Sequence, residues 1–84
     1  MNHETEKKIG GNIRHLRESA GLTQEQLAAR LQVHGCDITR SALAKIEVGQ
    51  RHLYPDEIIL IKKLLGIEYD DIFKIDQHNV KNNS

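Results

Sequence analysis

The chain has 84 residues, of which 38% are hydrophobic and 29% are charged. This length fits a single domain, because most domains have roughly 100–150 residues and few have fewer than about 50. No apolar run approaches the roughly 18 residues that a membrane span needs. The first eight residues are polar and lack the apolar stretch of a secretory signal. These features predict one soluble domain in the cytoplasm, without membrane contact.

Twelve Lys and Arg balance twelve Asp and Glu, whereas a nucleic-acid-binding domain is often basic. The charges are unevenly distributed, because residues 1–54 carry eight basic and six acidic side chains, and residues 55–84 carry four and six. Cys36 is the only cysteine, which excludes an intramolecular disulfide and a four-cysteine zinc site. The histidines lack metal-binding spacing, and no nucleophile has an evident base partner. We therefore expect no metal, no cofactor and no enzymatic activity.

The first half of the chain predicts two helices. Ile9, Ile13 and Leu16 recur at helical steps and predict a helix over residues 5–20. Thr23 and Gln26 fit a capping box, in which each side chain bonds the other residue's backbone N–H. This box predicts a second helix that ends near Gln32.

The second half predicts three more helices. Thr39 is a suitable N-cap for a helix over residues 40–48, with Leu43 and Ile46 facing inward. Pro55 suits the first turn of a fourth helix, which Gly66 ends, and residues 69–74 predict a short fifth helix. The sequence thus predicts an all-α, compact five-helix bundle over residues 1–76. Residues 77–84 are polar and are expected to form a flexible tail.

The predicted helices over residues 23–32 and 40–48 are consecutive, and both require the same small core. Two short helices joined by a turn form a helix-turn-helix, whose second helix can present its outer side to the DNA major groove. The residues at these positions also resemble a known family. Residues 13–17, 21–28 and 41–49 are similar to the XRE-type helix-turn-helix of phage repressors and Cro proteins, and the resemblance covers residues 9–74. It implies a five-helix bundle that binds operator DNA, usually as a dimer.

One segment departs from the family pattern. The family passes from the leucine of its second helix to the cap of its third helix through a tight turn. Here six residues, 32–37, separate Leu31 from Ile38 and Thr39. We expect Ile38 and Thr39 to keep their places in the core and at the helix cap, so the added residues extend the helices or form a surface bulge.

Contacts with bases are predicted on the third helix. With Leu43 and Ile46 inward, Ser41, Ala44 and Lys45 point outward, and Arg40 lies in the first turn. Arg can bond guanine bidentately, Ser can donate or accept, and an apolar group can meet a thymine methyl. The resemblance also implies that Arg40 and Ser41 read bases. The alternative is that Arg40 and Lys45 are ordinary solvated charges.

Contacts with phosphates are predicted on the flanking elements. Gln24 lies at a helix N-terminus, which attracts anions, and the family's matching Gln usually touches the DNA backbone. Gln50 and Arg51 follow the third helix, and Asn12 on the first helix is a weaker candidate. Glu47 matches the family's Ile-Glu pair and is poorly suited to face phosphates, so we expect a structural ion pair with Arg14 or Arg17; the alternative is a solvated carboxylate. The predicted DNA-binding residues are Gln24, Thr39, Arg40, Ser41, Ala44, Lys45, Gln50 and Arg51.

The sequence therefore predicts a sequence-specific, double-stranded DNA-binding regulator, such as a repressor, a controller protein or an antitoxin. The alternative is a protein-interaction module on the same fold, which the neutral net charge favours, with a toxin or another regulator as partner. A homodimer is expected through the C-terminal third, where apolar residues exceed what one helix face can bury. Those residues are Ile58, Ile59, Leu60, Ile61, Tyr69 and Phe73.

Overall fold

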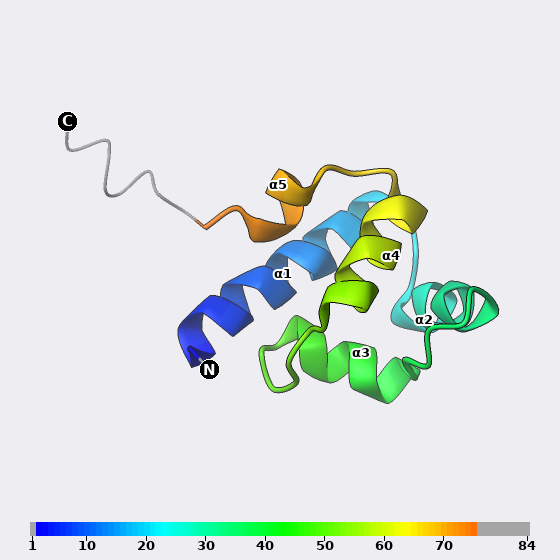
Figure 1. The fold of residues 1–84 in the computed structure, drawn as a ribbon, viewed down its shortest axis with the longest axis horizontal. Coiled ribbons are helices and arrows are strands. Elements are labelled where there is room, and N and C mark those ends of the chain that lie inside the picture. The colour runs from blue at the N-terminus through cyan, green and yellow to red at the C-terminus, as the bar shows by residue number, and fades with distance from the viewer. Residues whose placement is uncertain (1, 76–84) are drawn as a thin grey trace.

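The computed structural model describes residues 2–75. Five α-helices make up the described chain, without strands, as the sequence predicted (Figure 1). The predicted tail, residues 77–84, lies outside the described residues. The helices are α1 (His3–Ser19), α2 (Gln24–Val33), α3 (Arg40–Glu47), α4 (Pro55–Leu65) and α5 (Tyr69–Phe73).

The helix starts follow from local hydrogen bonds. Asn2 Oδ1 accepts the Thr5 N–H at 3.1 Å, and α1 therefore begins earlier than the apolar spacing predicted. The capping box of Thr23 and Gln26 is confirmed, with both hydrogen bonds present. The Thr39 hydroxyl accepts the Ala42 N–H at 3.1 Å, which confirms the predicted cap of α3. Side-chain oxygens thus satisfy N–H groups that the helices leave free.

The helices surround one apolar core. Leu27, Leu43 and Ile46 are buried together, as predicted, and α4 and α5 contribute Ile61 and Ile72. In Figure 1, α1 runs through the middle of the bundle, with α3 on one side and α5 on the other, and α1 contacts both. α2 packs against α3 and α4. None of the helices in residues 2–75 combines the length and hydropathy of a membrane span.

The connection between α2 and α3 is an ordered turn. Gly35 has φ +86°, and the Cys36 N–H returns to the Leu31 carbonyl at 2.9 Å, as in a glycine-terminated helix. The Gln32 side chain donates to the Ile38 carbonyl at 2.8 Å, and Ile38 is fully buried. The added residues therefore extend α2 to Val33 and then form a bulge, while Ile38 keeps its predicted place.

Gly10 allows α1 to lie directly against the end of α3. Gly10 is buried, and a Cβ built on it would lie 2.0 Å from the Ile46 carbonyl oxygen. No side chain fits at that distance, so this close approach requires glycine. By contrast, a Cβ on the neighbouring Gly11 would meet nothing within 4 Å.

These two glycines give a matched test of the packing. We expect Gly10→Ala to lower the free energy of unfolding by roughly 1–3 kcal/mol, because overpacking forces the backbones apart. Gly11→Ala should instead raise it by up to about 1 kcal/mol, since alanine is the better helix former. Urea unfolding followed by circular dichroism measures both values. Equal effects of the two substitutions would contradict the close contact.

Candidate nucleic-acid interface

α3 presents a polar outer side to solvent. Its inner residues, Leu43 and Ile46, are 0% and 2% exposed. Arg40, Ser41 and Lys45 are exposed and Ala44 is half-buried, as the predicted register requires. The two cations and the hydroxyl therefore share one accessible surface at the beginning and middle of α3.

Thr39 sets where this surface begins. Its hydroxyl oxygen accepts the Ala42 N–H, so the first turn of α3 starts at Arg40. The hydroxyl of a threonine that accepts one bond still has its own hydrogen to donate. Thr39 is exposed, so a phosphate or base edge next to Arg40 can receive that hydrogen.

A buried ion pair holds the far end of α3. Arg17 Nε lies 2.7 Å from Glu47 Oε2, and Arg17 Nη2 lies 3.0 Å from Glu47 Oε1. The two side chains are only 7% and 1% exposed. This bidentate bond raises the pKa of Arg17 despite its desolvation, so the guanidinium stays charged. Arg14 pairs instead with Glu18 on its own helix, which decides between the two predicted partners of Glu47.

The same carboxylate binds the first residue of α2. Gln24 Nε2 donates to Glu47 Oε1 at 2.9 Å, and Gln24 is half-buried. Arg17 Nη1 also donates to the Leu22 carbonyl just before α2, at 2.7 Å. Arg17 and Glu47 therefore join α1, the start of α2 and the end of α3. The sequence indicated the ion pair through the resemblance, but no local pattern indicated the bond to Gln24.

Gln50 and Arg51 lie in different environments. Gln50 is exposed. Arg51 forms two hydrogen bonds with Glu57, at 2.8 and 3.0 Å, donates to the His52 carbonyl at 3.0 Å and lies over the Tyr54 ring. These contacts direct Arg51 toward the start of α4. The phosphate contacts of Arg51, Gln24 and Gln50 stay predictions.

Asn12 lies on the side of α1 that faces α5. Its amide donates to the carbonyls of Ile72, at 2.9 Å, and Lys74, at 2.7 Å, so both of its hydrogens are used at α5. This position gives Asn12 a structural role in place of the phosphate contact expected of it. The distance of 60 residues along the chain explains why no sequence pattern indicated it.

Within residues 2–75, neither Cys36 nor the possible metal ligands show a reactive arrangement. Cys36 is half-buried, and burial together with the charges of Glu57 and Asp56 raises the pKa of its thiol. A raised pKa lowers the thiolate fraction and thus the reactivity. Within the described residues, no three His, Cys, Asp or Glu side chains come together as metal ligands would.

Two short helices joined by a turn, with the second exposing a polar outer side, define a helix-turn-helix protein. A family model described as Helix-turn-helix matches residues 13–72, which is most of the chain. The chain belongs to this family of DNA-binding transcription regulators, the XRE or phage-repressor type. Members of the family are typically not enzymes. No curated protein and no solved structure matched the chain.

The pair of Arg51 and Glu57 makes stability depend on pH. Burial raises the pKa of Glu57, but bonds from Arg51 and the Tyr54 N–H outweigh this effect and lower it below its usual value. A lowered pKa means that the charged carboxylate stabilises the fold above the unfolded pKa of about 4.3, and that this contribution is lost as the pH falls through the lower folded value.

Glu57→Gln removes this titration, because glutamine keeps the shape but not the charge. We expect it to lower the free energy of unfolding at pH 7 by about 1–3 kcal/mol. The difference from the wild type should shrink as the pH falls toward 3. Urea unfolding between pH 3 and pH 7 measures it, and a difference that does not change with pH would contradict the assignment.

Proposed function

We propose that this protein is a sequence-specific, double-stranded DNA-binding transcriptional regulator without catalytic activity, acting as a repressor or controller. The observation that carries the proposal is the surface of α3. This helix is fixed at its far end by Glu47, and it exposes Arg40, Ser41 and Lys45 at its beginning and middle. In a helix-turn-helix, the second helix enters the major groove and its N-terminal residues contact base edges. A regulator of this kind acts on DNA in the cytoplasm.

Different side chains should contact the base edges and the phosphates of the DNA. Arg40 and Ser41 lie in the first turn of α3 and are proposed to bond base edges, with Lys45 and Ala44 farther along the same side. Thr39 flanks them. Gln24, Gln50 and Arg51 are proposed to face phosphates, and the backbone N–H groups at the start of α2 support Gln24 there.

Selection from a random duplex library should return a preferred site, whose affinity falls steeply with salt because counterions are released. Arg40→Ala should weaken binding to that site by about 1–3 kcal/mol and relax the preference at one base pair. Arg14→Ala is the control, since this exposed arginine on α1 pairs with Glu18 of the same helix and is not among the residues proposed to contact DNA or a second copy. Fluorescence anisotropy at several salt concentrations measures both.

If Arg40→Ala lowers affinity for the selected site and for unrelated DNA by the same factor, Arg40 does not read a base. If the wild-type protein shifts no duplex at any salt concentration, the DNA-binding proposal fails. The alternative, a protein-interaction or antitoxin-like module that does not bind DNA by itself, would then be favoured by the neutral net charge.

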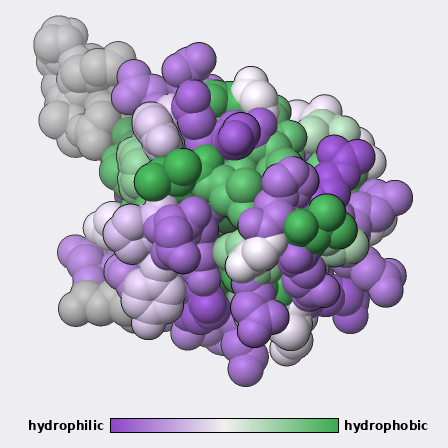
Figure 2. Space-filling view, turned by 45° about the vertical axis from the view of Figure 1, so that its right-hand side comes forward, coloured by the Kyte–Doolittle hydropathy of each residue, from purple (hydrophilic) through white to green (hydrophobic). Residues whose placement is uncertain are grey.

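We also propose that the protein is a homodimer formed through α4 and α5. Ile59, Tyr69 and Phe73 are 54%, 43% and 42% exposed, whereas Ile61, expected to add to this surface, is fully buried in the core. Figure 2 shows hydrophobic residues gathered in the middle of one face and bordered by hydrophilic ones. Apolar patches with a polar rim are typical of protein–protein contacts.

Sedimentation equilibrium at micromolar concentration tests the dimer, with and without a palindromic duplex built from the selected site. We expect a dimer on the duplex, because two copies related by a two-fold axis can read two half-sites about 34 Å apart. A protein that stays monomeric in solution and binds one copy per duplex would refute this part of the proposal.

A further inference from the structure

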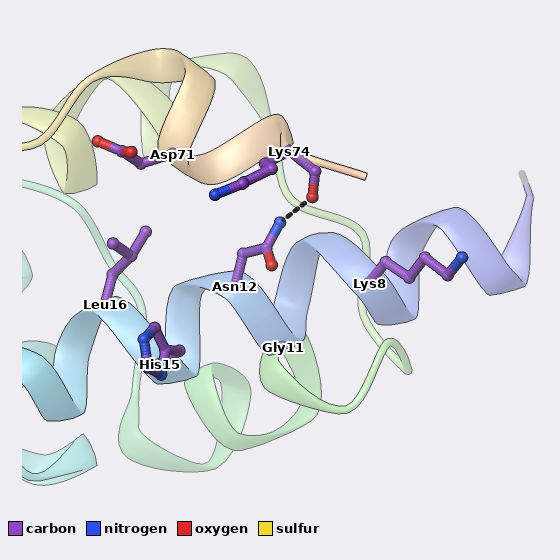
Figure 3. Close-up of a pocket in the computed structure, with 7 residues that line it drawn as sticks. All are labelled: Lys8, Gly11, Asn12, His15, Leu16, Asp71 and Lys74. Atoms are coloured by element: carbon purple, nitrogen blue, oxygen red, sulfur yellow. Dashed lines mark hydrogen bonds between the residues drawn. The ribbon is translucent and has the colours of Figure 1, made fainter. Parts of the chain in front are cut away.

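An open groove runs between α1 and α5 (Figure 3). Gly11 provides no side chain on the α1 wall, where a Cβ would meet nothing within 4 Å, so the groove is open beside Asn12, and Leu16 adds apolar surface at one end. The bonds from Asn12 to the carbonyls of Ile72 and Lys74 hold α5 as the opposite wall. The groove has a volume of about 670 Å³ and is lined by Lys8, Gly11, Asn12, His15, Leu16, Asp71 and Lys74.

An unpartnered aromatic side chain lies next to this groove. Phe73 is 42% exposed although its neighbour Ile72 is fully buried. A second, shallower hollow is lined by Phe73 together with Asp71 and Lys74, and the same two residues line the groove. The projecting ring and the groove are therefore neighbours on one surface, separated only by Asp71 and Lys74.

The charges of the two parts are complementary. Glu68 is the N-cap of α5, and Asp70 and Asp71 lie in its first turn; all three are exposed, so the helix that carries Phe73 is acidic at its start. The α1 side of the groove carries Lys8 and His15, both exposed. An acidic helix with a projecting aromatic ring thus matches a groove that is open beside Gly11 and carries the cation of Lys8 on its α1 wall, and one chain carries both.

We propose that the groove is occupied by α5 of a second copy, so that Phe73 of each copy enters the α1–α5 groove of the other. This inference rests on the homodimer proposed above and specifies its contact. A two-fold axis passing between groove and ring makes the contact reciprocal, which is the arrangement of most homodimers. In this proposed arrangement, Asp71 of each copy faces Lys74 of the other copy near the axis. α3 lies on the other side of α1 and stays uncovered (Figure 1).

Filling the groove tests the contact directly. Gly11→Leu places a side chain where a Cβ meets nothing within 4 Å, so the fold is kept while the groove is closed. We expect Gly11→Leu and Phe73→Ala each to weaken dimerisation by at least about tenfold, the loss typical of an aromatic anchor. The control is Val33→Ala on α2, another exposed apolar residue (81%), which should leave dimerisation unchanged. Sedimentation equilibrium gives the constants, and circular dichroism verifies that each variant folds.

A crosslink tests the pairing of the two residues independently. In a Cys36→Ala background, one preparation carries Gly11→Cys and another carries Phe73→Cys, and the two are mixed under oxidised glutathione. The mixture should give a disulfide-linked dimer containing one chain of each kind, well above the yield of either preparation alone.

The possible results distinguish the groove contact from the homodimer and from DNA binding. A wild-type dimer that Gly11→Leu does not weaken, and that gives no mixed crosslink, would overturn the groove contact and leave the dimer standing. A wild-type protein that is monomeric both with and without the duplex would overturn the dimer and the groove contact together. DNA binding itself is decided separately by the anisotropy measurements.

Discussion

The bidentate ion pair of Arg17 and Glu47 is the interaction on which the position of α3 depends. Burying two charges is costly, and it is offset only when the geometry is good and further hydrogen bonds satisfy the remaining atoms. Here both carboxylate oxygens and three guanidinium nitrogens are bonded, with Gln24 and the Leu22 carbonyl completing the set. Because the cost of burying the two charges offsets much of their attraction, the main consequence of the pair is geometric. It sets how the last turn of α3 lies relative to α1 and the start of α2.

The interactions that could be predicted from the sequence are local ones. The caps at Thr23 and Thr39 join residues three apart, and the inward residues of α3 follow from helical spacing, so the starts of α2 and α3 and the outer side of α3 were predicted well. The added residues between α2 and α3 did not disturb this, because the buried Ile38 anchors the chain before the cap. Helix ends differed by a residue or so, which is where fraying makes boundaries least definite.

The remaining features of the site depend on residues far apart in the chain. Gln24 meets Glu47 across 23 residues, and Asn12 meets Ile72 across 60. Such contacts depend on how helices cross, which composition and periodicity do not determine. For this reason the sequence could nominate Gln24 and Asn12 as polar and accessible, but it could not show that one bonds the carboxylate of α3 and the other bonds α5. Arg51 and Glu57 are closer in the chain, but a loop lies between them, so no periodic pattern in the sequence predicts their pairing.

The two glycines of α1 show how one helix serves two surfaces. Successive residues of an α-helix point about 100° apart, so Gly10 and Gly11 open different sides of α1. Gly10 removes the side chain that would keep α3 away, which allows the close approach next to the ion pair. Gly11 removes a side chain on the α5 side, which leaves the groove open. Helix propensity alone disfavours both glycines; the close contact with α3 requires the glycine at Gly10, and the groove contact proposed above would account for the one at Gly11. α1 thus separates the proposed DNA-binding side from the proposed dimer side, and each can be altered without touching the other.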